Sequence, residues 1–227
     1  MQKLSRPTAR MLALVSLLVS SMATAQVPTE GDSDFPRWLG LSVRAGYLMP
    51  GGQMDGSPDP FYLYEVYKGL FAAIVEPTVR IGSNVELGPW LQLSHAQMRL
   101  RCSSDDMCPG RHLRFGLQGN YHWIPSGPYN PWTGVALGYE RASFNVRGID
   151  IAYSGPDVTL QAGFDRNFGG SFWAGLFVSC SGGRYDSLEV KMNGRTGDES
   201  LRERTVHLWL GFGVRVRMAA PTSTSHP

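Results

Sequence analysis

The sequence predicts an all-β fold, an eight-stranded antiparallel up-and-down transmembrane β-barrel. Three observations predict it. Apolar and polar residues alternate in segment after segment, as they do in strands whose two faces meet different surroundings. All of these segments are ten residues or longer, which is the length that a tilted strand needs to cross a bilayer. The connections between them are alternately short and long, a one-sided pattern that is typical of membrane barrels.

The first part of the chain has the features of a secretory signal peptide, predicted for residues 1–25. Three basic residues precede the apolar run from Met11 to Val19, and a small-residue cleavage site ends at Ala25. Cleavage leaves about 202 residues, a size suited to one domain. In this mature chain we expect a periplasmic linker, the barrel and a disordered periplasmic tail, over residues 26–35, 36–218 and 219–227.

Eight segments carry the alternation. In the fourth of them, apolar or small residues at odd positions from Leu113 to Trp123 oppose polar or small residues at even positions from His112 to His122. The predicted strands are Trp38–Met49, Ala72–Ile81, Val85–Arg99, Arg111–Trp123, Trp132–Val146, Asp157–Arg166, Ser171–Ser181 and Thr205–Met218.

The predicted connections differ in length on the two sides of the barrel. Short or tight connections fall at residues 82–84, 124–131 and 167–170. Longer ones, rich in Gly, Asp, Ser and Arg, fall at residues 50–71, 100–110, 147–156 and 182–204. Because an even number of strands brings both ends of the barrel to the side of the short turns, that side is predicted to be periplasmic and the longer loops external.

The last segment shows why the barrel is expected to be inverted relative to a soluble one. From Val206 to Met218 alternate residues are apolar, whereas the face from Thr205 to Arg217 is small, polar and cationic. Long strands and a glycine-dense polar face favour lipid outside and a narrow polar lumen inside. Aromatic residues near the strand ends are interpreted as interfacial girdles: Trp38, Trp123, Trp132 and Phe172 on one side, and Tyr47, Tyr139 and Tyr185 on the other. The alternative is a soluble periplasmic lipocalin-like binding barrel, with the apolar face buried.

Charge argues against one class of binding partner, and the cysteines predict a covalent link within the chain. Without the signal peptide the chain has 18 basic against 19 acidic residues, and it has no basic tract with interleaved aromatics, so nucleic acid is not expected as a partner. Cys102 and Cys108 flank a polar, turn-like segment, and in an exported chain they predict a loop-closing disulfide. A metal site there needs more ligands than His112 supplies. Cys180 is interpreted as a small apolar residue on a strand.

Two strand sequences carry a family resemblance: GVALGYE, from Gly134 to Glu140, and WLGFGVRVRM, from Trp209 to Met218. With the signal peptide and the eight-strand layout, they resemble the small outer-membrane barrels of the OmpA, OmpX and OmpW kind. The resemblance implies the outer membrane of a Gram-negative-type bacterium as the location. It also implies lipid, lipopolysaccharide and the barrel-assembly machinery as partners, and leaves the oligomeric state open.

The polar face carries charges of both signs. An eight-stranded barrel is about wide enough inside for side chains to fill it, so these groups are expected to pair with one another. The predicted lumen network is Arg44, Glu76, Arg80, Glu86, Arg114, Glu140, Asp165, Arg215 and Arg217, with His112 and His122 on the same face. The alternative is a narrow polar pore gated by arginine–carboxylate pairs.

Two further features lie at the predicted external end. Arginines on the outward face there are expected to contact lipopolysaccharide phosphates, unless they are simply solvated loop residues: Arg99, Arg111, Arg141, Arg184 and Arg204. In the segment Asp59–Phe71, Asp59 as N-cap, Pro60 and Gly69 make a short helix possible. Its aromatics could cover the barrel mouth or receive an apolar ligand; the alternative is a packed loop or an extension of the flanking strands.

Catalysis is not expected. Ser94 and His95 are adjacent, but neighbours on a strand point to opposite faces and cannot act as a nucleophile and its base. No cofactor or metal is expected. The sequence therefore predicts an outer-membrane barrel with a structural or passive transport role and a salt-bridged lumen. The alternatives are an OmpW-like conduit or binder for small hydrophobic ligands and the soluble lipocalin-like barrel.

Overall fold

The computed structural model of this 227-residue chain describes residues 38–53, 62–99, 110–146, 148–192, 195–200 and 206–219. Its strands are β1 (Leu39–Gly52), β2 (Tyr67–Ile81), β3 (Val85–Met98), β4 (Gly110–His122), β5 (Tyr129–Val146), β6 (Ile149–Gly169), β7 (Phe172–Gly183), β8 (Ser187–Met192), β9 (Arg195–Ser200) and β10 (His207–Ala219). One short helix, α2 (Leu63–Val66), precedes β2. The predicted signal peptide, linker and disulfide, and the predicted tail beyond Ala219, lie outside the described residues.

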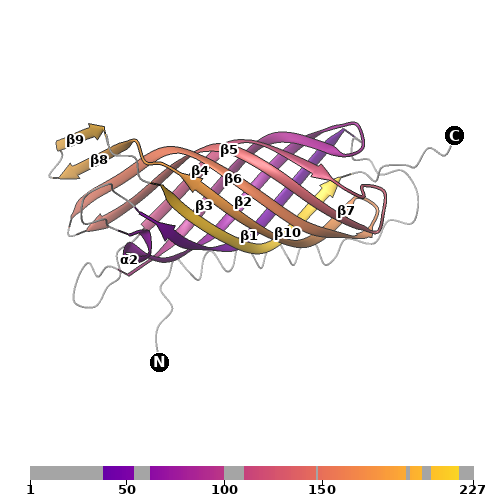
Figure 1. The fold of residues 1–227 in the computed structure, drawn as a ribbon, viewed down its shortest axis with the longest axis horizontal. Coiled ribbons are helices and arrows are strands. Elements are labelled where there is room, and N and C mark those ends of the chain that lie inside the picture. Colours follow the sequence, from indigo (N-terminus) through magenta and orange to yellow (C-terminus); the bar gives the residue numbers. More distant parts are fainter. Residues whose placement is uncertain are drawn as a thin grey trace, which may run out of the picture. The chain divides into compact units, whose positions relative to one another are not determined.

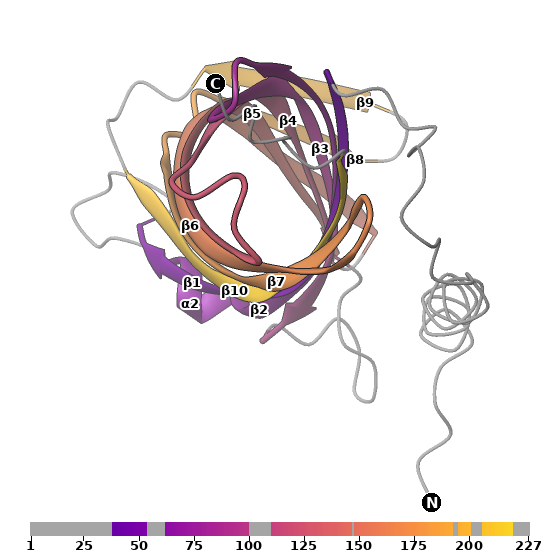
Figure 2. The ribbon, with the colours of Figure 1, turned by 90° about the vertical axis from the view of Figure 1, so that its right-hand side faces the viewer.

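Eight of the strands close into a ring, which confirms the predicted fold class (Figures 1 and 2). Neighbours along the chain pair antiparallel from β1 to β7, and β10 fills the gap between β7 and β1. The closing pair runs in unbroken register from Gly40 opposite Ala219 to Gly52 opposite His207. Each ring strand therefore has a partner on both sides, which leaves no open sheet edge within the ring.

The two ends of the ring differ. At one end, the short-turn end, the connections are residues 82–84, 123–128 and 170–171, and these confirm the predicted short turns. The opposite end, the long-loop end, carries α2 and the β8–β9 hairpin, which projects beyond the ring in Figure 1.

Two of the predicted long loops are wrong in part. Residues 149–156 belong to β6, which follows β5 through a turn at Gly148 with φ of +83°. Residues 187–200 form the β8–β9 hairpin, and β8 pairs with β6 just beyond the last residue of β6 that pairs with β7. Both segments are polar enough to resemble loops, but alternate residues such as Ile151 and Tyr153 pack against the interior of the barrel and hold the extension in place.

The predicted helix in the first long loop is also displaced. Asp59 and Pro60 lie outside the described residues, and the helix begins after Tyr62, where the Glu65 carboxylate accepts a hydrogen bond from the Tyr62 backbone N–H at 3.0 Å. It is only four residues long, because β2 begins directly after it at Tyr67. The described residues contain no helix long and apolar enough to cross a membrane.

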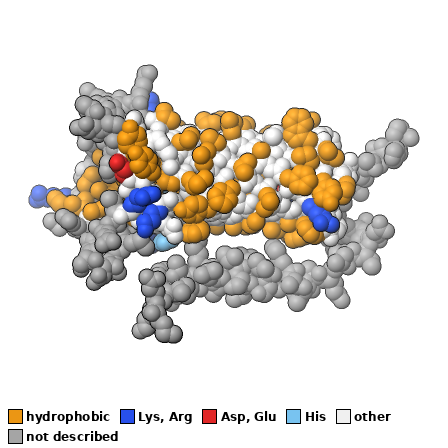
Figure 3. All heavy atoms as spheres, turned by 60° about the horizontal axis from the view of Figure 1, so that its bottom comes forward, with side chains coloured by type: hydrophobic (Ala, Val, Ile, Leu, Met, Phe, Trp, Pro, Cys, Tyr) orange, Lys and Arg blue, Asp and Glu red, His pale blue; other side chains and the backbone are white. Residues whose placement is uncertain are grey.

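The apolar face of the strands points outward. Leu117 is 69% exposed, Leu176 66% and Leu160 62%, and Figure 3 shows hydrophobic side chains distributed over the barrel wall between two ends that carry charge. A soluble lipocalin-like barrel requires the reverse arrangement, with these residues inside. An exposed apolar belt of this kind is the surface that a barrel presents to lipid.

The interior has two parts. At the long-loop end lies an apolar cap, a cluster of buried residues to which α2 contributes: Leu48, Leu63, Val66, Tyr67, Leu70, Ala72, Ala96, Met98, Ala142, Phe144, Tyr185 and Trp209. The rest of the interior is mainly polar and charged, with a second, small apolar cluster of Ile74, Trp90 and Ala136 and further aromatic rings among these groups. Two residues that were predicted for the aromatic girdles, Trp132 and Tyr185, are instead fully buried, because their side chains share the inward face of the ring.

Candidate functional site: a salt-bridged lumen

Alternation places the charged side chains inside, and inward glycines make room for their large neighbours. A Cβ on Gly163 would lie 2.5 Å from the Trp132 ring, and one on Gly138 would lie 2.7 Å from the Trp90 ring. A Cβ on Gly175 would similarly lie 2.5 Å from Asp165 Oδ1. The glycine content of the inward face is thus what allows this narrow barrel to hold tryptophans and charges at the same level.

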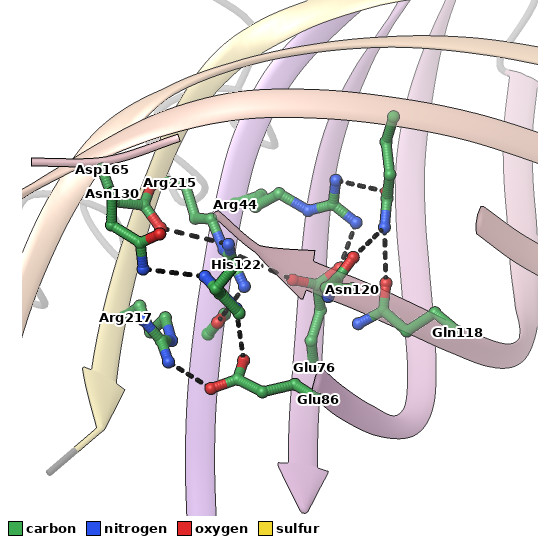
Figure 4. A network of polar contacts seen from close by, with 12 residues as sticks. Arg44, Glu76, Glu86, Gln118, Asn120, His122, Asn130, Asp165, Arg215 and Arg217 are labelled. Carbon is green, nitrogen blue, oxygen red and sulfur yellow. Dashed lines mark hydrogen bonds and ion pairs between the residues drawn. The ribbon is translucent and has the colours of Figure 1, made fainter. Parts of the chain in front are cut away.

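Nearest the short-turn end, Glu86 is the centre of a group of buried ionic contacts (Figure 4). Its carboxylate pairs with the guanidinium of Arg217 from β10 and, at 3.3 Å, with that of Arg80 from β2. His122 Nε2 lies 3.1 Å from its other oxygen, and His122 Nδ1 lies 2.8 Å from the side-chain amide of Asn130. One carboxylate therefore links strands β2, β3, β4 and β10 across the lumen.

The middle of the lumen carries two more buried pairs, also drawn in Figure 4. Arg44 pairs with Glu76 on the neighbouring strand and donates to Gln161 Oε1 across the barrel at 2.8 Å. Arg215 donates to Asp165 Oδ2 at 3.1 Å, and its Nε lies 3.9 Å from Glu76 Oε2. Gln161 Nε2 in turn donates to Gln118 and Asn120 on β4. The middle layer thus links strands β1, β2, β4, β6 and β10.

Below the apolar cap, Glu140 is fully buried and is contacted by five side chains from β4, β10 and the β7–β8 connection. These are the Tyr185 hydroxyl at 2.6 Å, His112 Nε2 at 2.9 Å, His207 Nε2 at 3.2 Å, Trp209 Nε1 at 3.3 Å and Arg114 Nε at 3.6 Å. Arg114 also pairs with Asp157 and donates to Thr159 Oγ1 at 2.7 Å. Because Tyr185 lies between β7 and β8, this carboxylate connects the lumen to the root of the β8–β9 hairpin.

Four of the buried arginines also lie over an aromatic ring, an arrangement that favours a cation through the ring quadrupole. The distances from guanidinium carbon to ring centroid are 4.9 Å for Arg44 and Phe177, 5.2 Å for Arg114 and Trp90, 4.3 Å for Arg215 and Trp132, and 5.8 Å for Arg217 and Trp173. Each of these cations therefore has a carboxylate and a ring as neighbours.

The charges of the lumen balance. Five arginines and five carboxylates share the interior described here: Arg44, Arg80, Arg114, Arg215 and Arg217 with Glu76, Glu86, Glu140, Asp157 and Asp165. Every one of these side chains is 8% exposed or less. Burial of so many charges is tolerated only where each has a partner, so the arrangement fills the lumen with mutually neutralised groups. We name these ten residues the charged section.

The structure places all nine residues of the predicted lumen network in this charged section. The predicted network lacks Asp157, which belongs to the charged section, and His207, which contacts it. Asp157 has the same strand parity as Thr159, Gln161 and Asp165, and that parity could have identified it. The pairing itself had no sequence signal, because partners such as Arg44 and Gln161 are 117 residues apart.

The predicted lipopolysaccharide-facing arginines have different surroundings. Arg99, Arg111, Arg141 and Arg184 are exposed at the long-loop end, and Arg204 lies outside the described residues. Among the described residues, Arg141 forms an ion pair with Glu189 of β8 at 2.5 Å. Ser94 is buried on the inward face and its neighbour His95 is exposed on the outward face. The described residues contain no group of three or more His, Cys, Asp or Glu side chains suited to hold a metal ion.

Comparisons with known proteins concern the fold. No protein-family model matches the sequence, and no curated protein matches it significantly. Among solved structures, Neisserial surface protein A is similar over 78% of this chain and 96% of its own, with 12% identity and a TM-score of 0.52. Outer membrane protein AlkL, solved in lipid bilayers, has 13% identity over 89% of this chain and 100% of its own, with a TM-score of 0.49. The shared fold is that of a small outer-membrane β-barrel.

Proposed function

We propose that this chain is an outer-membrane protein whose barrel has a structural role: it fixes the strands and loops of the long-loop end at the cell surface and does not conduct. The observation that carries this function is the filled lumen. Five buried arginines and five buried carboxylates neutralise one another along the interior, and the apolar cap covers them at the long-loop end. A pore for ions or polar solutes needs hydrated space, which such packing removes.

The location is part of the same proposal. The exposed belt of leucines, valines and phenylalanines favours lipid as the surrounding medium, and exposed Trp38 and Trp123 at the short-turn end suit an interface with water. The predicted signal peptide provides a route of export, and insertion by the barrel-assembly machinery would follow. In this orientation the long-loop end is external.

Two measurements test the proposal. Cells that express the chain are fractionated, and the membrane-derived protein is compared boiled and unboiled on a mild SDS gel, where a folded barrel is expected to migrate differently from the boiled chain. The purified protein is then placed in planar bilayers, where we expect no steady conductance. The proposal would be wrong if the chain were released as a soluble periplasmic protein. It would also be wrong if the protein showed a stable unit conductance that Arg80→Ala or Glu140→Ala alters. Glu189→Ala, which changes an exposed ion pair, is the matched control.

A second candidate function is favoured by one observation, the apolar cap itself. Twelve buried residues with aliphatic and aromatic side chains form an apolar site at the external mouth, and the four-residue α2 contributes two of them, Leu63 and Val66. A small hydrophobic ligand could take the place of α2 there. If this function holds, a fluorescent apolar probe will bind the folded wild-type protein and will bind the Leu70→Asn variant more weakly. If the role is structural alone, no saturable binding of the probe is expected.

We assign no catalytic step to the chain. The inward Ser94 Oγ accepts a hydrogen bond from Gln92 Nε2 at 3.0 Å, and the three buried histidines of the lumen face carboxylates or amides. Histidines with such contacts can simply fill a polar interior, so their presence does not by itself indicate proton transfer. Turnover of a lipid or ester substrate that His112→Ala abolishes would contradict this assignment.

A further inference from the structure

Exposed cations are distributed unevenly between the two ends of the barrel. In the described part of the chain, the long-loop end carries seven of them: Lys68, Arg99, Arg111, Arg141, Arg184, Lys191 and Arg195. The short-turn end carries Arg166, which lies over the rings of Tyr129 and Phe168. The same end also carries acidic side chains, including exposed Glu65 and Asp150 and partly buried Asp186 and Glu189, so attraction of an anion there depends on where the cations cluster rather than on the end as a whole.

Strand register brings three of the outward groups together. His95 on β3 is directly opposite Arg111 on β4, and Arg111 is diagonal to Arg141 on β5, because Arg111 pairs with Ser143 and Leu113 pairs with Arg141. Side chains that are opposite or diagonal on one face of antiparallel strands are within reach of one another when they are long. His95, Arg111 and Arg141, all exposed, form a basic patch across three adjacent strands.

The basic patch lies directly above the apolar belt. The next outward residue toward the middle of the barrel is Leu93 below His95, Leu113 below Arg111 and Tyr139 below Arg141, one strand repeat of about 7 Å away. Phe71, which is exposed and opposite His95 on β2, borders the patch on one side. The patch thus sits at the level where acyl chains end and headgroups begin, which is where an arginine is inexpensive on a lipid-facing surface.

From this geometry we infer that the basic patch is a binding site for a phosphate group of lipopolysaccharide lipid A in the outer leaflet, with Glu189 as an internal competitor for Arg141. The inference rests on the proposed location of the barrel. Arg111 and Arg141 supply planar, multiply donating guanidinium groups suited to phosphate oxygens, and the His95 imidazole supplies a further donor. The external end is the one that lipopolysaccharide surrounds, so its lipid A phosphate is the occupant rather than a phospholipid of the inner leaflet.

Glu189 gives the site a distinctive property. Its Oε2 accepts a hydrogen bond from Arg141 Nη2 at 2.5 Å, and the side chains of Glu189 and Arg141 remain 37% and 49% exposed, so a second anion can approach the same guanidinium. A phosphate on Arg141 must share it with this carboxylate or displace it. Glu189→Gln removes the competing charge and is therefore expected to strengthen phosphate binding, a direction that solvated loop arginines without a ligand would not produce.

The test uses the full chain folded in detergent and titrated calorimetrically with purified lipid A that retains both phosphates. The double variant Arg111→Gln with Arg141→Gln is expected to bind about tenfold more weakly, since it removes charge-assisted hydrogen bonds. Glu189→Gln is expected to bind about threefold more tightly, a change that corresponds to a weak surface ion pair. Arg166→Gln, which removes an exposed arginine at the opposite end, is the matched control and should bind like the wild type.

The other outcomes decide against the site. Unchanged affinity of the double variant, unchanged or weaker affinity of Glu189→Gln, or an equal loss in Arg166→Gln would each overturn it. Dephosphorylated lipid A should bind like the double variant, and phosphatidylglycerol micelles should not compete at equal phosphate; equal competition would reject lipid A as the occupant. Heat-modifiable migration is checked for each variant, so loss of the barrel is distinguished from loss of the site.

Discussion

The charged section and the apolar cap occupy the same lumen and are built on the same strands, but they are held together differently. On β10 the inward residues change from Trp209 in the cap to Arg215 in the charged section within six positions. On β5 they change from Phe144 to Glu140 within four. The cap is stabilised by contact between apolar groups, which needs no particular partner, whereas each charge below it needs a defined one.

The two regions therefore tolerate substitution to different degrees. A cap side chain can be replaced by another of similar size and polarity, since its contribution comes from area removed from water and from close packing. A charge cannot be replaced alone, because its partner would be left desolvated and unpaired. Glu86 shows the consequence most clearly, because Arg217, Arg80 and His122 all contact its two oxygens.

The largest expected effect follows from Glu86→Ala. It leaves Arg217 and Arg80 without this carboxylate in the interior, and the free energy of unfolding in detergent is expected to fall by about 3–5 kcal/mol. Urea unfolding followed by the loss of heat-modifiable migration measures it. Glu189→Ala, which removes an exposed carboxylate of the same length, is the control. A loss below about 1 kcal/mol would mean that water reaches this part of the lumen and that the contrast with the cap is not real.

The apolar cap should respond less strongly. Leu63→Ala removes a fully buried side chain of α2, and we expect the free energy of unfolding to fall by about 2–3 kcal/mol. The value lies at the lower end of the range for buried leucines because a short helix at the end of a barrel can move toward the space that the substitution leaves. Leu63→Met keeps nearly the same volume, so it should lower the free energy of unfolding by less than about 1.5 kcal/mol. An equal loss in both variants would contradict packing as the cause.

Space in the charged section is tested by Gly163→Ala. The added methyl group would lie 2.5 Å from the Trp132 ring and 2.6 Å from the Leu176 carbonyl oxygen, so the ring that supports Arg215 must shift. A cost of about 1–2 kcal/mol is expected for this overpacking. Gly182→Ala, whose Cβ would have no neighbour closer than 3.9 Å, should unfold at nearly the same urea concentration as the wild type. If the two variants behaved alike, the interior would be looser than its contacts indicate.

The smallest effect is expected outside the lumen. A double-mutant cycle on Arg141 and Glu189, with each changed to Ala singly and together, should give a coupling energy of about 0–1 kcal/mol, because both side chains are exposed and water screens the pair. The same cycle on Arg215 and Asp165, both fully buried, should give a larger coupling. Similar coupling energies for the two pairs would contradict the view that the lumen charges are buried and the Arg141–Glu189 pair is exposed to water.

Strand parity, the alternation of inward and outward residues along each strand, could be predicted from the sequence, and it was sufficient to predict most of the fold. Two alternating faces on each of eight segments were enough to place Arg44, Glu76 and Glu140 on the inward side. Parity failed in the extension of β6 before Asp157 and in β8, which resemble loops because most of their residues are partly buried or exposed.

The partners inside the lumen could not be predicted in the same way. Which carboxylate meets Arg215 depends on the register of β6, β7 and β10 together, and a shift of two residues on one strand would exchange Asp165 for a different residue without altering the alternation. The direction of Trp132 also depends on Gly163, which lies on the neighbouring strand and leaves space for the ring. Such a match between two strands is a property of the assembled ring rather than of either segment.

The placement of the tryptophans gives this protein a built-in spectroscopic reporter. Trp90, Trp132, Trp173 and Trp209 are at most 5% exposed inside the ring, whereas Trp38 and Trp123 are 59% and 58% exposed at the short-turn end. A brominated lipid or dissolved acrylamide would quench the emission of the second group and leave the first. The unquenched light would then come from indoles beside guanidinium groups and Glu140, so intrinsic fluorescence of the unlabelled chain can separate opening of the interior from changes in the surrounding bilayer.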